Sequence, residues 1–137
     1  MDNHTRWQQR HDSFTRALSL LEEGVTSDPS ALSMLEKEGV VHRFEYTFDL
    51  AWKTLKDYLQ AQGVDLRPVA PRQVLKQALI AEALQEGQVW MDMLEDRVRA
   101  SHQSNEAGLA EVARTIHELY LPAMQALQLW LDGQRPE

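Results

Sequence analysis

The sequence predicts an all-α fold, an antiparallel up-and-down bundle of four or five helices joined by short loops. Three observations support this prediction. Apolar residues recur three and four positions apart over long stretches, which is the period of a helix with one buried face. Glycine or proline separates these stretches. No segment shows the alternation of apolar and polar residues that is typical of a β-strand.

The first predicted helix covers residues 5–23, where apolar residues follow helical spacing from Phe14 onward. Trp7 precedes the clear part of this stripe, so we expect it to be exposed or to belong to a partner surface. Asp28 followed by Pro29 is typical of an N-cap and a first helical turn, so we expect the next helix to begin there.

The strongest helical pattern is an apolar stripe over about five turns that ends at Leu59. Its members are Val41, Phe44, Phe48, Ala51, Trp52, Leu55 and Leu59. Gly39 lies just upstream, and because glycine costs about 1 kcal/mol relative to alanine inside a helix, we expect a break or kink there. Residues 63–70, which include Pro68, then form a connection.

Three further helices follow. Pro71 opens a short one that ends before Gly87, since proline suits the first helical turn. The next covers about 88–101, and the last begins near Asn105. Pro122 lies inside the apolar stripe of the last helix, where its missing backbone N–H should kink or split the helix. The predicted core or interface aromatic residues are Trp52, Trp90, Trp130, Tyr46, Tyr58 and Tyr120.

The length and composition favour a single domain over residues 1–137. The chain is 43% hydrophobic, which is enough for one core. Its apolar stretches fall far short of the roughly 20 residues that a membrane span needs, and the start of the chain lacks a secretory signal. We therefore expect a cytoplasmic protein without membrane contact. The sequence contains no cysteine, which excludes disulfides and thiolate metal sites.

The formal net charge of -7 and the pI near 5.2 argue against non-specific coating of nucleic acid, so any RNA contact needs a local basic patch. The candidate patches are Arg6, Arg10 and Arg16, then Lys53 and Lys56, then Arg67, Arg72 and Lys76. The alternative for each patch is a solvated helix face with ion pairs. The histidines lack the tight spacing of a zinc site, and no glycine-rich phosphate loop occurs, so we expect neither a metal nor a cofactor.

Two segments carry more specific patterns. Residues 43–59 read Arg-Phe-Glu-Tyr-Thr-Phe-Asp-Leu-Ala-Trp-Lys-Thr-Leu-Lys-Asp-Tyr-Leu, and residues 90–97 read Trp-Met-Asp-Met-Leu-Glu-Asp-Arg, with His102 beyond them. Together with the intervening Pro-Arg-Gln-Val of residues 71–74, they resemble the signatures of the nucleotidyltransferase substrate-binding family, which belongs to the HEPN superfamily. The resemblance covers roughly residues 10–130.

The resemblance implies a helical protomer that forms a homodimer and pairs with a minimal nucleotidyltransferase encoded beside it. The partner would supply the catalytic carboxylates, and this chain would be a substrate-binding or regulatory subunit with RNA or a nucleotide as a possible ligand. Many such pairs are toxin–antitoxin modules, in which the helical subunit is an RNase and the transferase silences it by adding AMP to a tyrosine. The alternative function is therefore a metal-independent RNase toxin, and whether the chain alone is an enzyme stays open.

The resemblance also points to a site. The superfamily's catalytic pattern is an arginine, four to six residues and a histidine, and Arg97 and His102 fit it at the implied dimer cleft. Histidine can transfer protons near neutral pH, and a guanidinium can stabilise phosphate charge. Side chains five positions apart point about 140° apart on a helix, so the pair converges only if the helix ends near Ser101. The predicted substrate- or nucleotide-binding set is Arg97, His102, Asp96, Ser104 and Lys53.

A structural interpretation of the same residues stays open. Arg97 can pair with a carboxylate of its own helix, such as Asp96 or Asp92, and His102 can interact with a helix dipole. Two departures from the family pattern also matter. Val98 stands where a polar residue often follows the arginine, which weakens the RNase hypothesis. Ser104 stands where many members carry the modified tyrosine, which weakens control by AMP addition.

Overall fold

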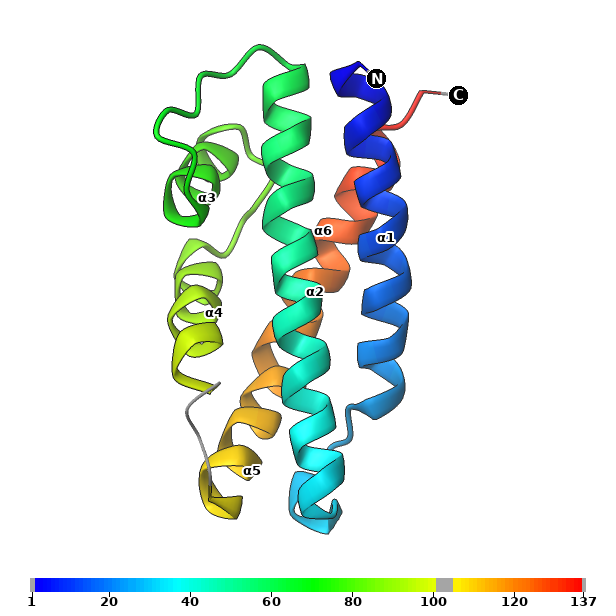
Figure 1. Ribbon diagram of the computed structural model, residues 1–137, viewed down its shortest axis with the longest axis vertical. Helices are drawn as coiled ribbons and strands as arrows, with labels where there is room; N and C mark the ends of the chain where they lie inside the picture. The colour runs from blue at the N-terminus through cyan, green and yellow to red at the C-terminus, as the bar shows by residue number, and fades with distance from the viewer. Residues whose placement is uncertain (1, 101–104, 137) are drawn as a thin grey trace.

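The computed structural model describes residues 2–100 and 105–136. This part of the chain contains helices and no strand, and the helices form an up-and-down bundle, which confirms the predicted fold class (Figure 1). The helices are α1 (Asn3–Gly24), the 3-10 turn η1 (Pro29–Ala31), α2 (Met34–Ala61), α3 (Pro71–Ile80), α4 (Gly87–Ala100), α5 (Glu106–Thr115), the π-helical η2 (Ile116–Tyr120) and α6 (Leu121–Gln134). None of them has the length and apolarity that a membrane crossing requires.

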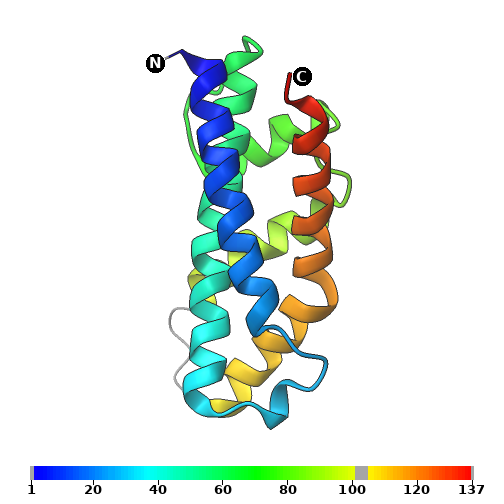
Figure 2. The same ribbon diagram turned by 90° about the vertical axis from the view of Figure 1, so that its right-hand side faces the viewer.

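The bundle has four columns of helix. The first column is α1, which descends, and the second is α2, which returns beside it. The third column consists of α3 and α4, which descend one below the other along α2 (Figure 1). The fourth column, α5 to α6, rises again, so the two ends of the chain lie at the same end of the bundle (Figure 2). The long apolar stripe predicted for residues 41–59 supplies much of the core, and Phe44, Phe48 and Leu55 are fully buried.

The start of α2 differs from the prediction. Asp28 makes no side-chain cap, and Pro29 opens only a three-residue 3-10 turn. The N-cap of α2 is Ser33, whose hydroxyl accepts from the Glu36 N–H at 3.1 Å while the Glu36 carboxylate accepts from the Ser33 N–H at 2.8 Å. This reciprocal pair is a capping box, and it satisfies two backbone donors where the Asp28 cap would satisfy one.

The expected break at Gly39 is wrong, because α2 runs through it without interruption. Gly39 is exposed, whereas its neighbours Val40 and Val41 are buried at 3% and 4% exposure. Burying one such side chain contributes about 1.5–3 kcal/mol, which outweighs the roughly 1 kcal/mol cost of glycine in a helix.

The expectation for Trp7 is also wrong, since its side chain is only 2% exposed. Its ring packs edge-on against Tyr58 at 5.2 Å and lies beside His11 at 6.0 Å. The buried face of α1 thus begins two turns earlier than the apolar pattern indicates, because one of its members is the buried histidine His11.

The predicted interruption near Pro122 is present. A π-helical segment precedes it, in which the Leu121 N–H donates to the Ile116 carbonyl, and Pro122 becomes the second residue of α6. The missing N–H of proline is tolerated there, since the first turn of a helix leaves its N–H groups without helical partners.

Two of the predicted core or interface tyrosines differ in burial. Tyr120, at the end of the π segment, is buried at 1% exposure, whereas Tyr46 on α2 is 57% exposed and is no core residue of this chain.

Candidate functional site

Arg97 lies in the last turn of α4 and reaches across to α2. Its Nη2 donates to Oδ1 of Asp49 at 2.9 Å, and the two side chains are 35% and 29% exposed. The carboxylate that the sequence offered on the same helix, Asp96, is not the partner. The contact therefore joins the two sequence segments that carry the family-like patterns, and it leaves part of the guanidinium open to solvent.

The Asp49 carboxylate accepts hydrogen bonds from three side chains. Its Oδ1 also accepts from Trp52 Nε1 at 3.1 Å, and its Oδ2 accepts from Lys53 Nζ at 3.0 Å. Partial burial acts to raise the pKa of Asp49, but the hydrogen bonds of Lys53 and Trp52 and the charge of Arg97 together hold this pKa below its usual value. The structure thus brings Arg97 and Lys53, both predicted site residues, to one ionised carboxylate.

Glu45 lies one turn before Asp49 on α2 and behaves in the opposite way. Burial raises the pKa of the Glu45 carboxyl, although the charges of His42 and Arg97 act to lower it. The site therefore holds one carboxyl with a lowered pKa, Asp49, and one with a raised pKa, Glu45. Such a split between neighbouring acids is a feature of sites that move protons, and structural ion pairs produce it too.

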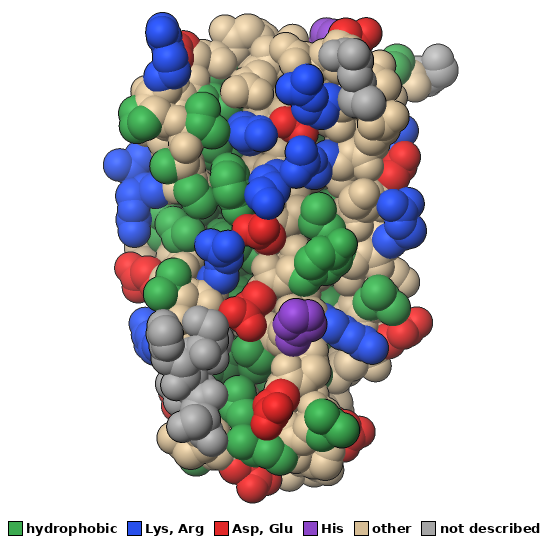
Figure 3. Space-filling view, in the orientation of Figure 1, with side chains coloured by type: hydrophobic (Ala, Val, Ile, Leu, Met, Phe, Trp, Pro, Cys, Tyr) green, Lys and Arg blue, Asp and Glu red, His purple; other side chains and the backbone are tan. Residues whose placement is uncertain are grey.

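A second carboxylate on α2, that of Asp57, forms ion pairs with two further cations. The side chain of Asp57 is fully buried, with Arg10 Nε of α1 at 3.3 Å and Lys56 Nζ at 3.4 Å from its oxygens. Both cations stay partly exposed, at 30% and 24%. Figure 3 shows basic and acidic side chains mixed over the middle of this face. We call the set Arg10, Lys53, Lys56 and Arg97 with Asp49 and Asp57 the α2 cationic strip.

The α2 cationic strip concentrates positive charge. It carries four cations against two carboxylates, on a chain whose formal net charge is -7. The carboxylates hold the cationic groups in place, and all four cationic side chains stay partly exposed. The predicted patches at Lys53 and Lys56 and at Arg10 thus meet, although they are far apart in the sequence.

Asp96 lies apart from this strip. It accepts a hydrogen bond from the hydroxyl of Tyr120, and its other oxygen lies 3.5 Å from Arg99 Nη2. Burial first of all, and then the Asp96 carboxylate, raise the pKa of the Tyr120 hydroxyl well above its usual range. The structure does not bring Asp96 together with Arg97 or Lys53, and it uses Asp96 to tie α4 to the fourth column.

Two predicted site residues, His102 and Ser104, lie outside the described residues. The pairing of Arg97 with His102 therefore stays a prediction. The described part of α4 runs to Ala100, and the predicted helix end near Ser101 lies outside the described residues. Within residues 2–100 and 105–136, no group of three His, Asp or Glu side chains is arranged to hold a metal ion.

Sequence reasoning missed Asp49, Glu45 and Asp57 as members of the site. A signal for the first two was present, because Glu45, Asp49 and Lys53 follow one another at intervals of four and so lie on one face of a helix. Nothing in the sequence pointed to the pairing of Asp57 with Arg10, since these residues are 47 positions apart (57 minus 10).

The comparisons with known proteins agree with this fold. Residues 9–132 match the family model described as "Nucleotidyltransferase substrate binding protein like". Among solved structures, the crystal structure of ttk003001694 from Thermus thermophilus is similar, with 29% sequence identity and a TM-score of 0.72. The match covers 89% of this chain and 99% of that one. The search of curated proteins found no match.

Proposed function

The chain belongs to the nucleotidyltransferase substrate-binding protein-like family, and from this premise we propose that it is the binding and regulatory subunit of a two-protein nucleotidyltransferase. In this proposal a minimal catalytic subunit, encoded beside it in a toxin–antitoxin-type module, docks on a cytoplasmic homodimer of this chain. The helical subunit presents or receives a nucleotide or RNA, and the catalytic subunit carries out the transfer.

The single observation that carries the proposal is the α2 cationic strip. The substrates of a nucleotidyltransferase carry phosphate, and a phosphate group needs fixed, partly exposed cations. Asp49 accepts from Nη2 of Arg97, whose side chain stays 35% exposed, and a guanidinium can form paired hydrogen bonds to phosphate oxygens. The Lys53 ammonium, held at 3.0 Å by the same carboxylate, supplies a second charge.

The RNase alternative makes a different demand on the same residues. It requires Arg97 to contact the scissile phosphate while His102 transfers protons. Arg97 is already bound to Asp49, so a phosphate at this position has to share the guanidinium with that carboxylate or displace it. We therefore keep the RNase as an outcome of the test.

The test is co-expression with the minimal nucleotidyltransferase encoded next to this chain. We expect a stable complex by size-exclusion chromatography, and transfer of labelled nucleotide by the complex. Arg97→Ala and Lys53→Ala should each reduce binding of the phosphate-bearing substrate. The matched control is Arg67→Ala, because Arg67 is 85% exposed and pairs with Asp65, outside the strip, in the connection before α3.

Each result has a definite meaning. Failure of the neighbouring transferase to bind this chain would overturn the proposal. Equal substrate binding by Arg97→Ala, Lys53→Ala and Arg67→Ala would show that the strip does not bind the substrate. Cleavage of RNA in EDTA by the free chain, abolished by His102→Ala, would replace the proposal with the RNase function.

A further inference from the structure

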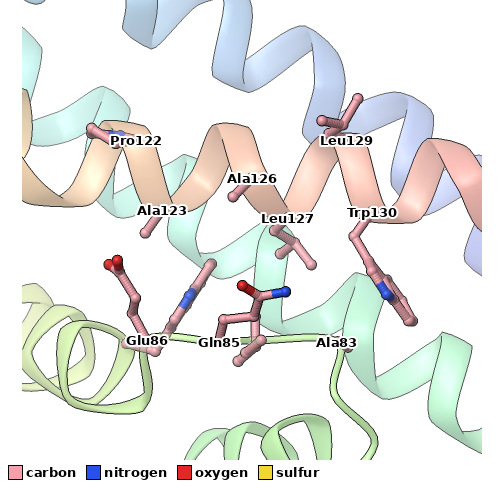
Figure 4. Close-up of a pocket in the computed structure, with 11 residues that line it drawn as sticks. Ala83, Gln85, Glu86, Pro122, Ala123, Ala126, Leu127, Leu129 and Trp130 are labelled. Carbon is pink, nitrogen blue, oxygen red and sulfur yellow. The ribbon is translucent and has the colours of Figure 1, made fainter.

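A pocket of about 380 Å³ opens between α6 and residues 81–86, the connection that joins α3 to α4 (Figure 4). This volume lies within the range of small-molecule sites. The lining residues that matter for its chemistry are Trp90, Trp130, Ala123, Ala126, Gln85 and Glu86. The pocket shares no residue with the α2 cationic strip, so the binding of a ligand in it is independent of the proposed function.

The pocket exists because two features coincide. The third column is interrupted between α3 and α4, and the intervening segment, which includes Glu82 at φ 62°, is not a helix that would fill the space with side chains. Opposite it, α6 presents the small side chains of Ala123 and Ala126. The side chains drawn in Figure 4 leave an open space between the two segments.

The aromatic walls of the pocket are fixed by the core. Trp90 is only 2% exposed, and its ring lies 6.2 Å from that of Phe48. Trp130 is partly buried, and its ring packs edge-on against Tyr58 at 5.2 Å. A ligand therefore meets preformed apolar surfaces, which lowers the ordering cost of binding.

The polar groups at the mouth define the charge of the ligand. The side chains of Gln85 and Glu86 point from the connection toward α6 (Figure 4). Within the described ranges, no Lys, Arg or His lines the pocket, and Glu86 forms no ion pair. A carboxylate or phosphate ligand would meet only the Glu86 charge and would be repelled. A positive group, in contrast, is attracted by the Glu86 carboxylate.

We propose that this pocket is a binding site for a small aromatic organic cation, with its ring against Trp130 and the alanines of α6 and its ammonium group beside Glu86. The ring supplies the apolar contact with α6 at Ala126. The ammonium group supplies the charge that distinguishes this ligand from a neutral one of the same shape.

The test uses two probes of matched shape, 2-phenylethylamine, which is an ammonium ion at neutral pH, and the uncharged 2-phenylethanol. Binding is followed by the fluorescence of the tryptophans and by NMR shifts of their indole N–H groups. We expect the ammonium probe to bind about three- to fivefold more tightly than the alcohol, as a partly exposed ion pair allows. Glu86→Gln should remove that difference without weakening the alcohol.

A blocking variant tests the location. Ala126→Phe should abolish binding of both probes by filling the pocket, and because Ala126 is exposed, the change should leave the melting temperature near that of the wild type. The control is Ala107→Phe, at an exposed position on α5, which should bind both probes normally. Absence of binding by the wild type, unchanged binding by Ala126→Phe, or equal affinity for the two probes with no effect of Glu86→Gln would each overturn the inference.

Discussion

The guanidinium of Arg97 and the carboxylate of Asp49, 48 positions apart in the sequence, meet at 2.9 Å between α4 and α2. Because both side chains are about one third exposed, solvent screens their attraction, and the pair is worth little to the fold. Its geometry is more consistent with orienting a cation than with holding two helices together. Stability measurements can separate these two roles.

We expect a double-mutant cycle of Arg97→Ala and Asp49→Ala to give a coupling energy of about 0.2–1 kcal/mol in the free energy of unfolding. The measurement is urea denaturation of the wild type, both single variants and the double variant. The coupling should shrink at high salt, since a partly exposed pair is screened. A coupling of several kcal/mol would show that the contact is a structural element of the bundle.

Tyr120→Phe should destabilise the protein by about 1–3 kcal/mol. The change removes the hydroxyl that donates to the carboxylate of Asp96, and a bond to a charged group in a buried position is expensive to lose. The control is Tyr46→Phe at a 57% exposed position, which should stay within about 0.5 kcal/mol of the wild type. Similar thermal unfolding of the two variants would contradict this role for the buried hydroxyl.

The sequence predicted the helical class and most helical segments, but it misplaced the start of α2 and showed little of the candidate site. Periodicity identified the core face of residues 41–59 and the interruption at Pro122, because both are local properties of the chain. Trp7 was misplaced, since the buried face of α1 contains His11 and a pattern of apolar residues alone does not show a buried polar member. Trp7 is buried by a tertiary contact with Tyr58 of α2, which a local pattern cannot show.

The partner of Arg97 shows why site geometry is harder to predict. The nearby carboxylate Asp96 was the natural partner by sequence distance, but it points to Tyr120 in the fourth column. Which of several acids a guanidinium reaches depends on the rotation of α4 about its axis, and that rotation is set by the packing of Trp90 and Met93 into the core. The resemblance to a family predicted Arg97 as a site residue and did not indicate its partner Asp49.

Ser33→Ala should cost about 1 kcal/mol, because it removes one half of the capping box at the start of α2. Asp28→Ala is the matched control, since Asp28 was the N-cap that the sequence suggested and it caps no helix in the structure. We expect that variant to stay within about 0.5 kcal/mol of the wild type by chemical denaturation. The reverse order of the two effects would place the functional cap at Asp28.

Gly39→Ala and Gly63→Ala should change stability in opposite directions. Gly39 lies inside α2, and a Cβ there meets no atom within 4 Å, so alanine should stabilise by about 0.5–1 kcal/mol. Gly63 has φ +84°, a conformation that costs a residue with a side chain roughly 1–2 kcal/mol, so alanine should destabilise. Thermal unfolding of the two variants measures both shifts, and a loss of stability in Gly39→Ala would show that the helix needs its flexibility there.

His11 should make stability depend on pH. Burial lowers the pKa of its imidazole below the ordinary value of 6.5, although the Asp132 carboxylate, 3.0 Å from Nε2, acts to raise it. Arg135 also faces the ring, with Nη1 3.4 Å from Nδ1, and favours the neutral form. The unfolded chain therefore takes up a proton at higher pH than the folded chain does. The stability contributed by neutral His11 is complete above about pH 6.5 and is lost as the pH falls toward the lower folded value.

This loss can reach at most about 1.4 kcal/mol per pH unit for one group. The measurement is the free energy of unfolding of the wild type and of His11→Gln between about pH 7.5 and about pH 5.5. We expect the wild type to lose more stability over this interval, because carboxylates elsewhere contribute equally to both proteins and cancel in the difference. The control Gln9→Ala changes an exposed residue of α1 that does not ionise, and it should keep the wild-type pH dependence. Parallel curves for the wild type and His11→Gln would mean that Asp132 offsets the burial of the ring, so that His11 takes up its proton at the same pH in the folded and unfolded chains.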